Sequence, residues 1–497
     1  MSKTAEEKLT EVAEQVEAEK KKKEEEKLSD QIVETEHEVT IGGETFSYKA
    51  TTGTLVMRDE EEKAKATIFF IAYTRNGIDE VGDRPLTFSF NGGPGSSSVW
   101  MHLGVLGPRR VQMDEGGEGL APRPPYQLIN NDYSILDRTD LVFIDPVSTG
   151  YSRPAPGEEA KQFHGLQKDL DSVGGFIRLY VTRYKRWSSP KYLIGESYGT
   201  TRAAGLAGHL QNRYGMYLNG IMLISVILNF QTALFSIGND LPYILFLPTY
   251  AATAWYHKLV SKTLQRKSLR TFLNEVEQFA LNEYTLALMK GSTLEEEERQ
   301  VIVAQLAKYT GLSTRYIEGC NLRPVIYRFV KEVLRSQQRT VGRFDSRMTG
   351  IDRDSVGEGH EYDPSFAVVQ GAYSAMINDY LRNDLNFESD LPYEILTGLY
   401  MKWDFGAQNE FVNVGETLRS TMNRNPYLRV FVANGYYDLA TPYFATEYTF
   451  NHLELEAEQQ ANITMGYYEA GHMMYTHLPS LQKQKEDLDQ FLDGSNL

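Results

Sequence analysis

Short apolar strands that alternate with helices constrain the fold of this chain more than any other pattern in its sequence. Strands are predicted at 85–90, 140–144, 192–194 and 220–225, with helices at 159–187 and 201–211. Buried strands of this length, separated by helices, are typical of a mainly parallel sheet covered by helices on both faces. Ligand sites in such sheets form where the strands end. The loops that follow these strands are therefore the first places to look for function.

The same alternation divides the chain into four regions. Residues 1–35 form a charged tail, expected to be a solvated extension or an arm that binds a partner. A first core region, 36–228, opens with strand patterns at 38–48, 53–57 and 66–73. Helical periodicity dominates 229–425 and predicts a helical insertion, or cap. Strand–helix alternation resumes in 426–497, the second part of the core.

Composition narrows the class of protein and its location. The chain of 497 residues is 41% hydrophobic, which predicts a globular fold, and its formal net charge of -16 argues against a nucleic-acid partner. Cys320 is the single cysteine, so no intramolecular disulfide can form. The longest apolar run, 220–228, is shorter than the roughly 20 residues that span a bilayer. Residues 1–30 contain no apolar run, and we expect a cytoplasmic protein without a membrane segment.

A nucleophile pattern follows the predicted strand 192–194. Gly195, Glu196, Ser197, Tyr198 and Gly199 form a Gly-x-Ser-x-Gly sequence, and a helix rich in small residues comes next. A sharp turn from strand to helix exposes a serine hydroxyl, and the glycines allow the two elements to approach closely. The strand and helix on either side give the short pattern its weight, and Ser197 is the candidate nucleophile.

A serine hydroxyl needs a base and an orienting acid, which follow the nucleophile in the order acid, then histidine, in α/β-hydrolases. Asp438 comes after the predicted strand 427–433, and His472 comes after the strand 462–468. Asp438 is alternatively a turn or helix N-cap residue, and His472 is alternatively structural. His477, which also follows Ser197 and Asp438 in the chain, is the one nearby alternative to His472 as the base.

A glycine-rich loop, Asn91-Gly92-Gly93-Pro94-Gly95, follows the strand 85–90. Backbone N–H groups in such a loop can bind the oxyanion of a tetrahedral intermediate. The alternative is a loop that cradles phosphate. That alternative is less favoured because no Gly-Lys-Ser/Thr follows and because Pro94 lacks an N–H donor.

Together these motifs resemble the serine carboxypeptidase family. The segments that carry the resemblance are 91–98, 143–146, 150–152, 195–199, 434–438 and 471–473. The resemblance implies an α/β-hydrolase fold with a helical insertion and the release of C-terminal amino acids from peptides. It implies that Ser197, Asp438 and His472 form a catalytic triad. It also implies an oxyanion hole made by the N–H groups of Gly93 and Tyr198.

The resemblance assigns recognition of the substrate's terminal carboxylate to Asn91, Gly92 and Glu196. Two carboxyl groups within hydrogen-bond reach must share a proton, so the pKa of Glu196 would rise when substrate binds. We therefore expect affinity for peptides to improve at acidic pH. The alternative is that Glu196 is a structural partner of nearby backbone.

The chain departs from the better-known secreted members of this family. Ser96 stands where they usually have Cys, and Val105 stands where many carry a Glu that supports the carboxylate-binding network. The chain therefore resembles a cytosolic, bacterial-type branch without disulfides. The missing Glu weakens strict carboxypeptidase specificity but does not affect the triad.

The leading hypothesis is a serine hydrolase that acts on peptides and uses neither a metal nor an organic cofactor. An esterase, amidase or acyltransferase with the same triad is the first alternative, because fold and triad do not determine the acyl acceptor. A non-catalytic binding protein on this fold is the second. Aromatic residues at 246–250 or 255–256 either line the substrate pocket or pack as ordinary helix residues.

Overall fold

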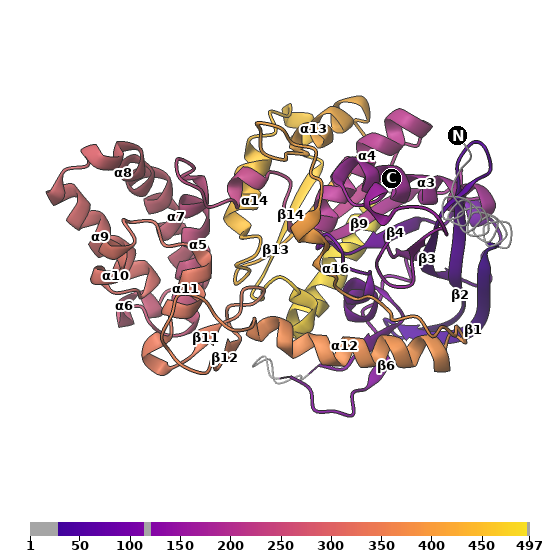
Figure 1. Cartoon of the computed structure of the whole chain (residues 1–497), viewed down its shortest axis with the longest axis horizontal. Helices are drawn as coiled ribbons and strands as arrows, with labels where there is room; N and C mark the ends of the chain where they lie inside the picture. Colours follow the sequence, from indigo (N-terminus) through magenta and orange to yellow (C-terminus); the bar gives the residue numbers. More distant parts are fainter. Residues whose placement is uncertain (1–27, 114–120, 495–497) are drawn as a thin grey trace, which may run out of the picture.

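The computed structural model describes residues 28–113 and 121–494 (Figure 1). Most of the predicted charged tail therefore lies outside the described residues. The expected boundary at residue 35 falls inside the first strand, β1 (Gln31–Ile41). Within the described ranges no helix combines the length and the apolar character needed to cross a membrane.

A ten-stranded sheet forms the centre of the molecule, in the order β1-β2-β3-β7-β4-β9-β10-β13-β14, with β8 paired to β3. From β7 to β14 neighbouring strands run parallel, and β1, β2 and β3 form an antiparallel edge that joins β7. The bounds are β2 (Glu44–Arg58), β3 (Ala64–Arg75), β4 (Leu86–Phe90), β7 (Asp140–Ile144), β8 (Arg153–Pro154), β9 (Lys191–Ser197), β10 (Gly220–Val226), β13 (Arg429–Gly435) and β14 (Ile463–Tyr468). This confirms the predicted mainly parallel sheet.

Helices cover both faces of the sheet. Along β10, Ile221 and Leu223 join one hydrophobic core, and Met222 and Ile224 join another. Because successive side chains of a strand point to opposite faces, the strand is buried on both sides and its sequence is continuously apolar. The first core includes α3 (Leu166–Arg183), α4 (Tyr198–Tyr214) and α13 (Gly415–Arg424), and the second includes α12 (Pro364–Asn383) and α16 (Leu478–Gly494).

A separate group of helices lies at one end of the molecule, on the left of Figure 1. These helices have their own hydrophobic core, which α14 (Tyr443–Asn451) also contacts. We call α5 to α11 the helical cluster. Its members are α5 (Leu241–Tyr256), α6 (Lys262–Gln265), α7 (Leu269–Phe279), α8 (Thr285–Lys290), α9 (Glu296–Thr310), α10 (Thr314–Gly319) and α11 (Ile326–Glu332).

The predicted insertion at 229–425 contains more than the helical cluster. Its last two long helices, α12 and α13, pack against opposite faces of the sheet. It also contains a short antiparallel pair that helical periodicity did not predict, β11 (Thr340–Val341) with β12 (Thr349–Gly350). The remaining elements are α2 (Val99–Met101), α15 (Ala457–Gln460) and the pair β5 (Arg109–Val111) with β6 (Leu128–Asn130).

Three predicted elements differ from those observed. The strands expected at 38–48 and 53–57 are instead β1 and a continuous β2, which pairs with β1 on one side and β3 on the other. Polar Thr51 and Thr52 lie in the gap between the two expected strands, although both are buried in the ladder. The helix expected at 159–187 forms only over Leu166–Arg183, because the extended residue Gly165 precedes it.

Candidate active site

Ser197 is the last residue of β9, and α4 begins at the next residue. Its backbone has φ 61° and ψ −129°, a strained conformation for a residue with a side chain. Glycines make the turn possible. A Cβ at Gly195 would lie 2.1 Å from the carbonyl oxygen of Gly199, and a Cβ at Gly199 would lie 2.8 Å from that of Phe90. The Gly-x-Ser-x-Gly pattern thus arises from close backbone contact around the serine.

The glycine-rich loop after β4 contacts this turn directly. A Cβ at Gly92 would lie 2.5 Å from the backbone nitrogen of Tyr198 and 2.7 Å from the carbonyl oxygen of Glu196. Gly93 has φ 108°, a conformation that favours glycine. Tyr198 is the first residue of α4, where backbone N–H groups lack partners within the helix. The structure therefore brings the two predicted oxyanion donors, at Gly93 and Tyr198, to one place.

His472 and Asp438 are hydrogen-bonded, although 34 residues separate them in the sequence. The distance from His472 Nδ1 to Asp438 Oδ2 is 2.7 Å. The backbone N–H groups of Ala440 and Thr441 donate to Asp438 Oδ1 at 2.7 and 3.0 Å, and the Thr441 hydroxyl donates to Oδ2 at 2.7 Å. The acid is thus held on both oxygens, and Thr441 is a partner that sequence reasoning missed.

The pKa of His472 reflects two opposed effects. Burial of the ring disfavours the imidazolium, but the negative charge of Asp438 and its hydrogen bond outweigh burial, so the pKa is raised above its usual value. Only 3% of His472 is exposed, and its backbone N–H donates to the carbonyl oxygen of Phe344 at 2.6 Å. His472 is consequently a fixed side chain whose charged form is stabilised by a carboxylate.

Glu196 is buried next to Ser197 without a counter-ion. Asn91 Nδ2 donates to Glu196 Oε1 at 2.8 Å, while Oε2 is buried and the hydroxyl of Tyr475 interacts with the same carboxyl group. Asn91 is itself oriented by the backbone N–H of Met101, which donates to Asn91 Oδ1 at 3.1 Å. Burial raises the pKa of Glu196 to about 7. This carboxyl group is therefore able to hold a proton near neutral pH.

Two tyrosines lie near Glu196, where the sequence offered no signal. A Cβ at Gly104 would lie 2.4 Å from the ring of Tyr475 and 2.9 Å from the hydroxyl of Tyr373. Both tyrosines are buried, and the charge of Glu196 contributes to raising the pKa of each, after burial itself. Neighbouring Val105 is 1% exposed and belongs to the hydrophobic core. This side of Glu196 thus presents phenols and apolar groups.

One cavity of about 540 Å³ joins most of the predicted site residues. Those that line it are Asn91, Gly92, Gly93, Glu196, Ser197 and His472. Asp438 lies behind His472, and the side chain of Tyr198 points to Trp403, whose Nε1 donates to the tyrosine hydroxyl at 3.0 Å. The rest of the wall includes residues that no motif indicated, among them Tyr327, Arg343, Phe344, His360, Asp363, Phe366, Leu396 and Tyr400.

The aromatic residues proposed from the sequence as pocket lining lie elsewhere. Residues 246–250 are buried in the core of the helical cluster, and Trp255 and Tyr256 pack against the same core. Ordinary helix packing is therefore the correct one of the two interpretations. The cavity takes its aromatic groups from Trp100, Tyr327, Phe344, Phe366 and Tyr400 instead.

Buried charges hold the two loops that form the site. Arg202 Nη1 donates to the carbonyl oxygen of Asn91 at 2.5 Å, and Arg202 Nε pairs with Asp169 Oδ2 at 2.7 Å. Asp145 Oδ1 accepts from the backbone N–H of Ser98 at 2.8 Å. A Cβ at Gly150 would lie 1.7 Å from Asp145 Oδ2. This close contact accounts for the glycine at the start of the segment 150–152. Arg202 follows Ser197 by five residues and gave no sequence signal.

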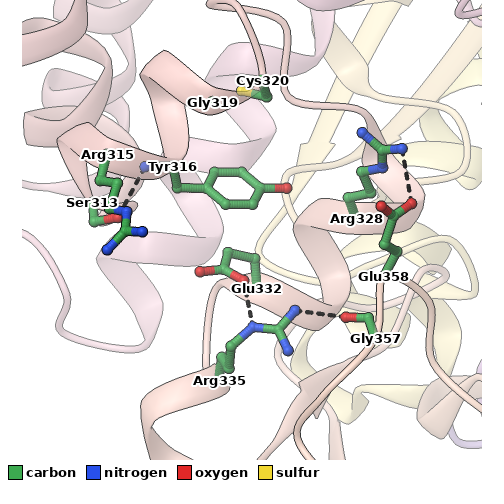
Figure 2. A pocket seen from close by; sticks show the side chains of 10 residues that line it. All are labelled: Ser313, Arg315, Tyr316, Gly319, Cys320, Arg328, Glu332, Arg335, Gly357 and Glu358. Atoms are coloured by element: carbon green, nitrogen blue, oxygen red, sulfur yellow. Dashed lines mark hydrogen bonds and ion pairs between the residues drawn. The ribbon is translucent and has the colours of Figure 1, made fainter.

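A second cavity, of about 390 Å³, lies among α10, α11 and the loop around Gly357 (Figure 2). It contains Cys320, which is half-buried, and burial raises the pKa of its thiol. A raised pKa is the opposite of what a thiolate nucleophile needs. Among the residues that the structure describes, no group of three or more His, Cys, Asp and Glu side chains is arranged to hold a metal ion.

Comparison with known proteins agrees with this geometry. Residues 42–477 match the family model described as serine carboxypeptidase. The pheromone-processing carboxypeptidase KEX1 of Saccharomyces cerevisiae is 32% identical over 147 residues, 28% of this chain and 19% of that protein. The carboxypeptidase Y homolog A of Phaeosphaeria nodorum is 30% identical over 142 residues, 28% of this chain and 23% of its own length. These segments span about a fifth of each relative.

The fold has a counterpart among solved structures. The crystal structure of KEX1(delta)p, a prohormone-processing carboxypeptidase from Saccharomyces cerevisiae, superposes with a TM-score of 0.56 at 17% identity and covers 90% of this chain and 91% of that one. This likeness confirms the α/β-hydrolase fold. Because the family model covers well over half of the sequence, the chain belongs to the serine carboxypeptidase family.

Proposed function

We propose that this protein is a serine carboxypeptidase that releases C-terminal amino acids from peptides, with Ser197 as nucleophile. The observation that carries the proposal is the hydrogen-bonded pair of His472 and Asp438, whose histidine lines one cavity with the strained Ser197. The buried Glu196 in the same cavity supports specificity for a free C-terminus. Membership of the family supports the reaction class.

The reaction proceeds through an acyl-enzyme. A carboxylate only accepts hydrogen bonds, so His472 Nδ1 carries the proton toward Asp438 and Nε2 is free to accept one. Nε2 takes the proton of Ser197 as its oxygen attacks the scissile carbonyl carbon, and the amides of Gly93 and Tyr198 bind the oxyanion. His472 then protonates the departing amine, which leaves as the C-terminal amino acid. Water, deprotonated by His472, attacks the ester and frees Ser197.

Recognition of the terminal carboxylate is assigned to Asn91, the N–H of Gly92 and Glu196. Two carboxylates cannot lie side by side in a buried site unless they share a proton. Glu196 supplies this proton because burial raises its pKa to about 7. The protonated form donates from one oxygen to the substrate, while Asn91 holds the other.

A second candidate is another acyl hydrolase or acyl transferase that uses the same triad. The observation that favours it is Val105, an apolar residue buried near the carboxylate site. Peptides with free and amidated C-termini separate the two functions. A carboxypeptidase loses most of its kcat/KM when the terminus is amidated, whereas equal values for both peptides would support the second candidate.

A serine-directed fluorophosphonate probe tests the nucleophile independently of the substrate. We expect labelling of the wild type and none of Ser197→Ala. Equal labelling of both proteins would reject Ser197 as the nucleophile. A peptide library digested at several pH values and read by mass spectrometry then identifies the bond that is cleaved.

We also propose a cytoplasmic location. The single cysteine supports it, because the fold forms without an intramolecular disulfide and does not need an oxidising compartment. Fractionation of the cells that produce the protein, with activity measured in each fraction, tests the location.

A further inference from the structure

Arg343 carries an unpaired positive charge into the catalytic cavity. It lines the same cavity as Ser197 and His472. Its backbone N–H donates to Asp363 Oδ1 at 3.2 Å, but no described residue forms an ion pair or hydrogen bond with its guanidinium group. Within the described ranges, the guanidinium lies over the ring of Phe344, with 4.7 Å from the guanidinium carbon to the ring centre. Such a group is available to a ligand.

The guanidinium lies close to the reacting groups. The rings of Phe344 and His472 are 5.0 Å apart between centres, so Phe344 contacts both the Arg343 guanidinium and the His472 ring. The positive charge of Arg343 is one of the contributions that act on the pKa of His472, in the lowering direction. A substrate group bound to Arg343 would therefore lie next to the bond that is cleaved.

A second donor lines the same side of the cavity. His360 is half-buried, and its Nδ1 is buried without a hydrogen-bond partner in the described part of the chain. The acid on this side, Asp363, has its Oδ1 occupied as the N-cap of α12, where it accepts from the backbone N–H and the hydroxyl of Ser365. Asp363 forms no ion pair with the Arg343 guanidinium among the described residues, and its contact with Arg343 is through the backbone N–H. Glu196 is held by Asn91.

Several other arginines are paired with acids, whereas Arg315, which lines the second cavity, has no ion pair among the described residues. In the second cavity, Arg328 pairs with Glu358 at 2.8 Å and Arg335 pairs with Glu332, as Figure 2 shows. Buried arginines such as Arg202 also pair with acids. Charges removed from water are normally compensated in this way. Arg343 lacks such a partner, and the catalytic cavity is where its partner would bind.

We propose that Arg343, with His360, forms a subsite for a carboxylate side chain of the peptide substrate. The enzyme then prefers Asp or Glu at one of the two residues that flank the scissile bond. This inference rests on the proposed carboxypeptidase function and adds a substrate class to it. The planar guanidinium donates two parallel hydrogen bonds to a carboxylate, and the imidazole adds a third.

The test compares kcat/KM for matched peptides that differ only in Glu, Gln or Lys, placed either last or next to last. We expect the wild type to prefer Glu at one of these positions by about tenfold or more, the range for a hydrogen bond to a charged group. Arg343→Gln should reduce this ratio to near one. Arg343→Glu should reverse the preference toward Lys. The ratio cancels any effect of the lost charge on His472, because one enzyme acts on both peptides.

The control is Arg339→Gln, which removes the same charge from an exposed residue outside the cavity and should keep the preference for Glu. The inference is overturned if the wild type does not discriminate. It is also overturned if Arg343→Gln slows both peptides equally. That result would show that Arg343 binds the terminal carboxylate, which both peptides share, and not the side chain. Binding of the two peptides to Ser197→Ala, measured by calorimetry, needs no turnover. It therefore separates failure of the subsite from failure of the proposed function.

Discussion

The sheet and the segment that covers its catalytic edge contribute to the active site in different ways. The sheet supplies Ser197, Asp438, His472 and the loop at Asn91, each just after a strand. The opposite wall comes from 327–400, where side chains come from α11, α12 and the irregular segments around them. Chemistry therefore lies in loops whose positions the strands determine, whereas the residues that would contact substrate side chains follow no local pattern.

The two regions also treat charge differently. On the sheet side, Arg202 pairs with Asp169, and Asp438 is hydrogen-bonded on both oxygens. On the covering side, the guanidinium of Arg343 and Nδ1 of His360 lack partners among the described residues. Satisfied buried charges make a rigid site, and unsatisfied donors in a cavity are available for binding. The comparison separates two sets of proposed roles: catalysis and recognition of the terminal carboxylate on the sheet side, and selection of a substrate side chain on the covering side.

The largest expected effect is on the sheet side. Ser197→Ala should lower kcat by about 10⁴-fold or more, because removing a triad nucleophile leaves only binding and oxyanion stabilisation. Urea unfolding should show unchanged stability. Retention of more than a few per cent of the activity would show that the sheet loops do not carry the chemistry.

A second test removes a charge that holds a sheet loop. Arg202→Met leaves Asp169 buried without its partner and frees the carbonyl oxygen of Asn91, so we expect a loss of about 3–5 kcal/mol in the free energy of unfolding. Arg213→Met is the matched control, since Arg213 lies on the same helix and is exposed. Equal urea midpoints for both variants would contradict the role of the buried pair.

A third test addresses the helical cluster. Leu306 is 0% exposed in its core, and Leu306→Ala should cost about 2–5 kcal/mol by leaving a cavity. Val301→Ala on the same helix is the control, because Val301 is 56% exposed. Fluorophosphonate labelling of Ser197 should continue under native conditions in both variants. Loss of labelling in folded Leu306→Ala would show that packing in the helical cluster affects the reactivity of Ser197 more strongly than we infer.

The smallest effect is a pH dependence on the sheet side. Burial raises the pKa of Glu196 to about 7, so the protonated form that binds a carboxylate is lost as the pH rises through that value. KM for a free peptide should then rise by up to about tenfold per pH unit above 7. At low pH, kcat/KM should fall as His472, whose pKa is raised, becomes protonated.

Glu196→Gln supplies the control for this pH dependence. An amide cannot titrate but still donates a hydrogen bond, so KM for a free peptide should become independent of pH above 7. The acid limb, which belongs to His472, should remain. An unchanged alkaline rise in KM would show that another group titrates when substrate binds.

Sequence patterns predicted the parallel part of the sheet well, because strands buried on both faces are apolar throughout. They failed at β2, where residues 49–52 between the two expected strands belong to one continuous strand that is paired on both sides. They also made α3 too long, since extended Gly165 precedes its first turn. Pairing between strands and contacts of a single glycine are tertiary effects that a local pattern does not contain.

The sequence by itself determined the strand-end loops and, through them, the candidate residues Ser197, Asp438 and His472, because glycine and apolar patterns are local consequences of close backbone contact and burial. Only the tertiary structure decided what surrounds them. Tyr475 next to Glu196, Arg202 beneath Asn91 and Arg343 in the cavity wall come from distant parts of the chain. Their effect on the candidate site residues depends on distance in space and on burial. Neither quantity can be derived from the spacing of residues along the sequence.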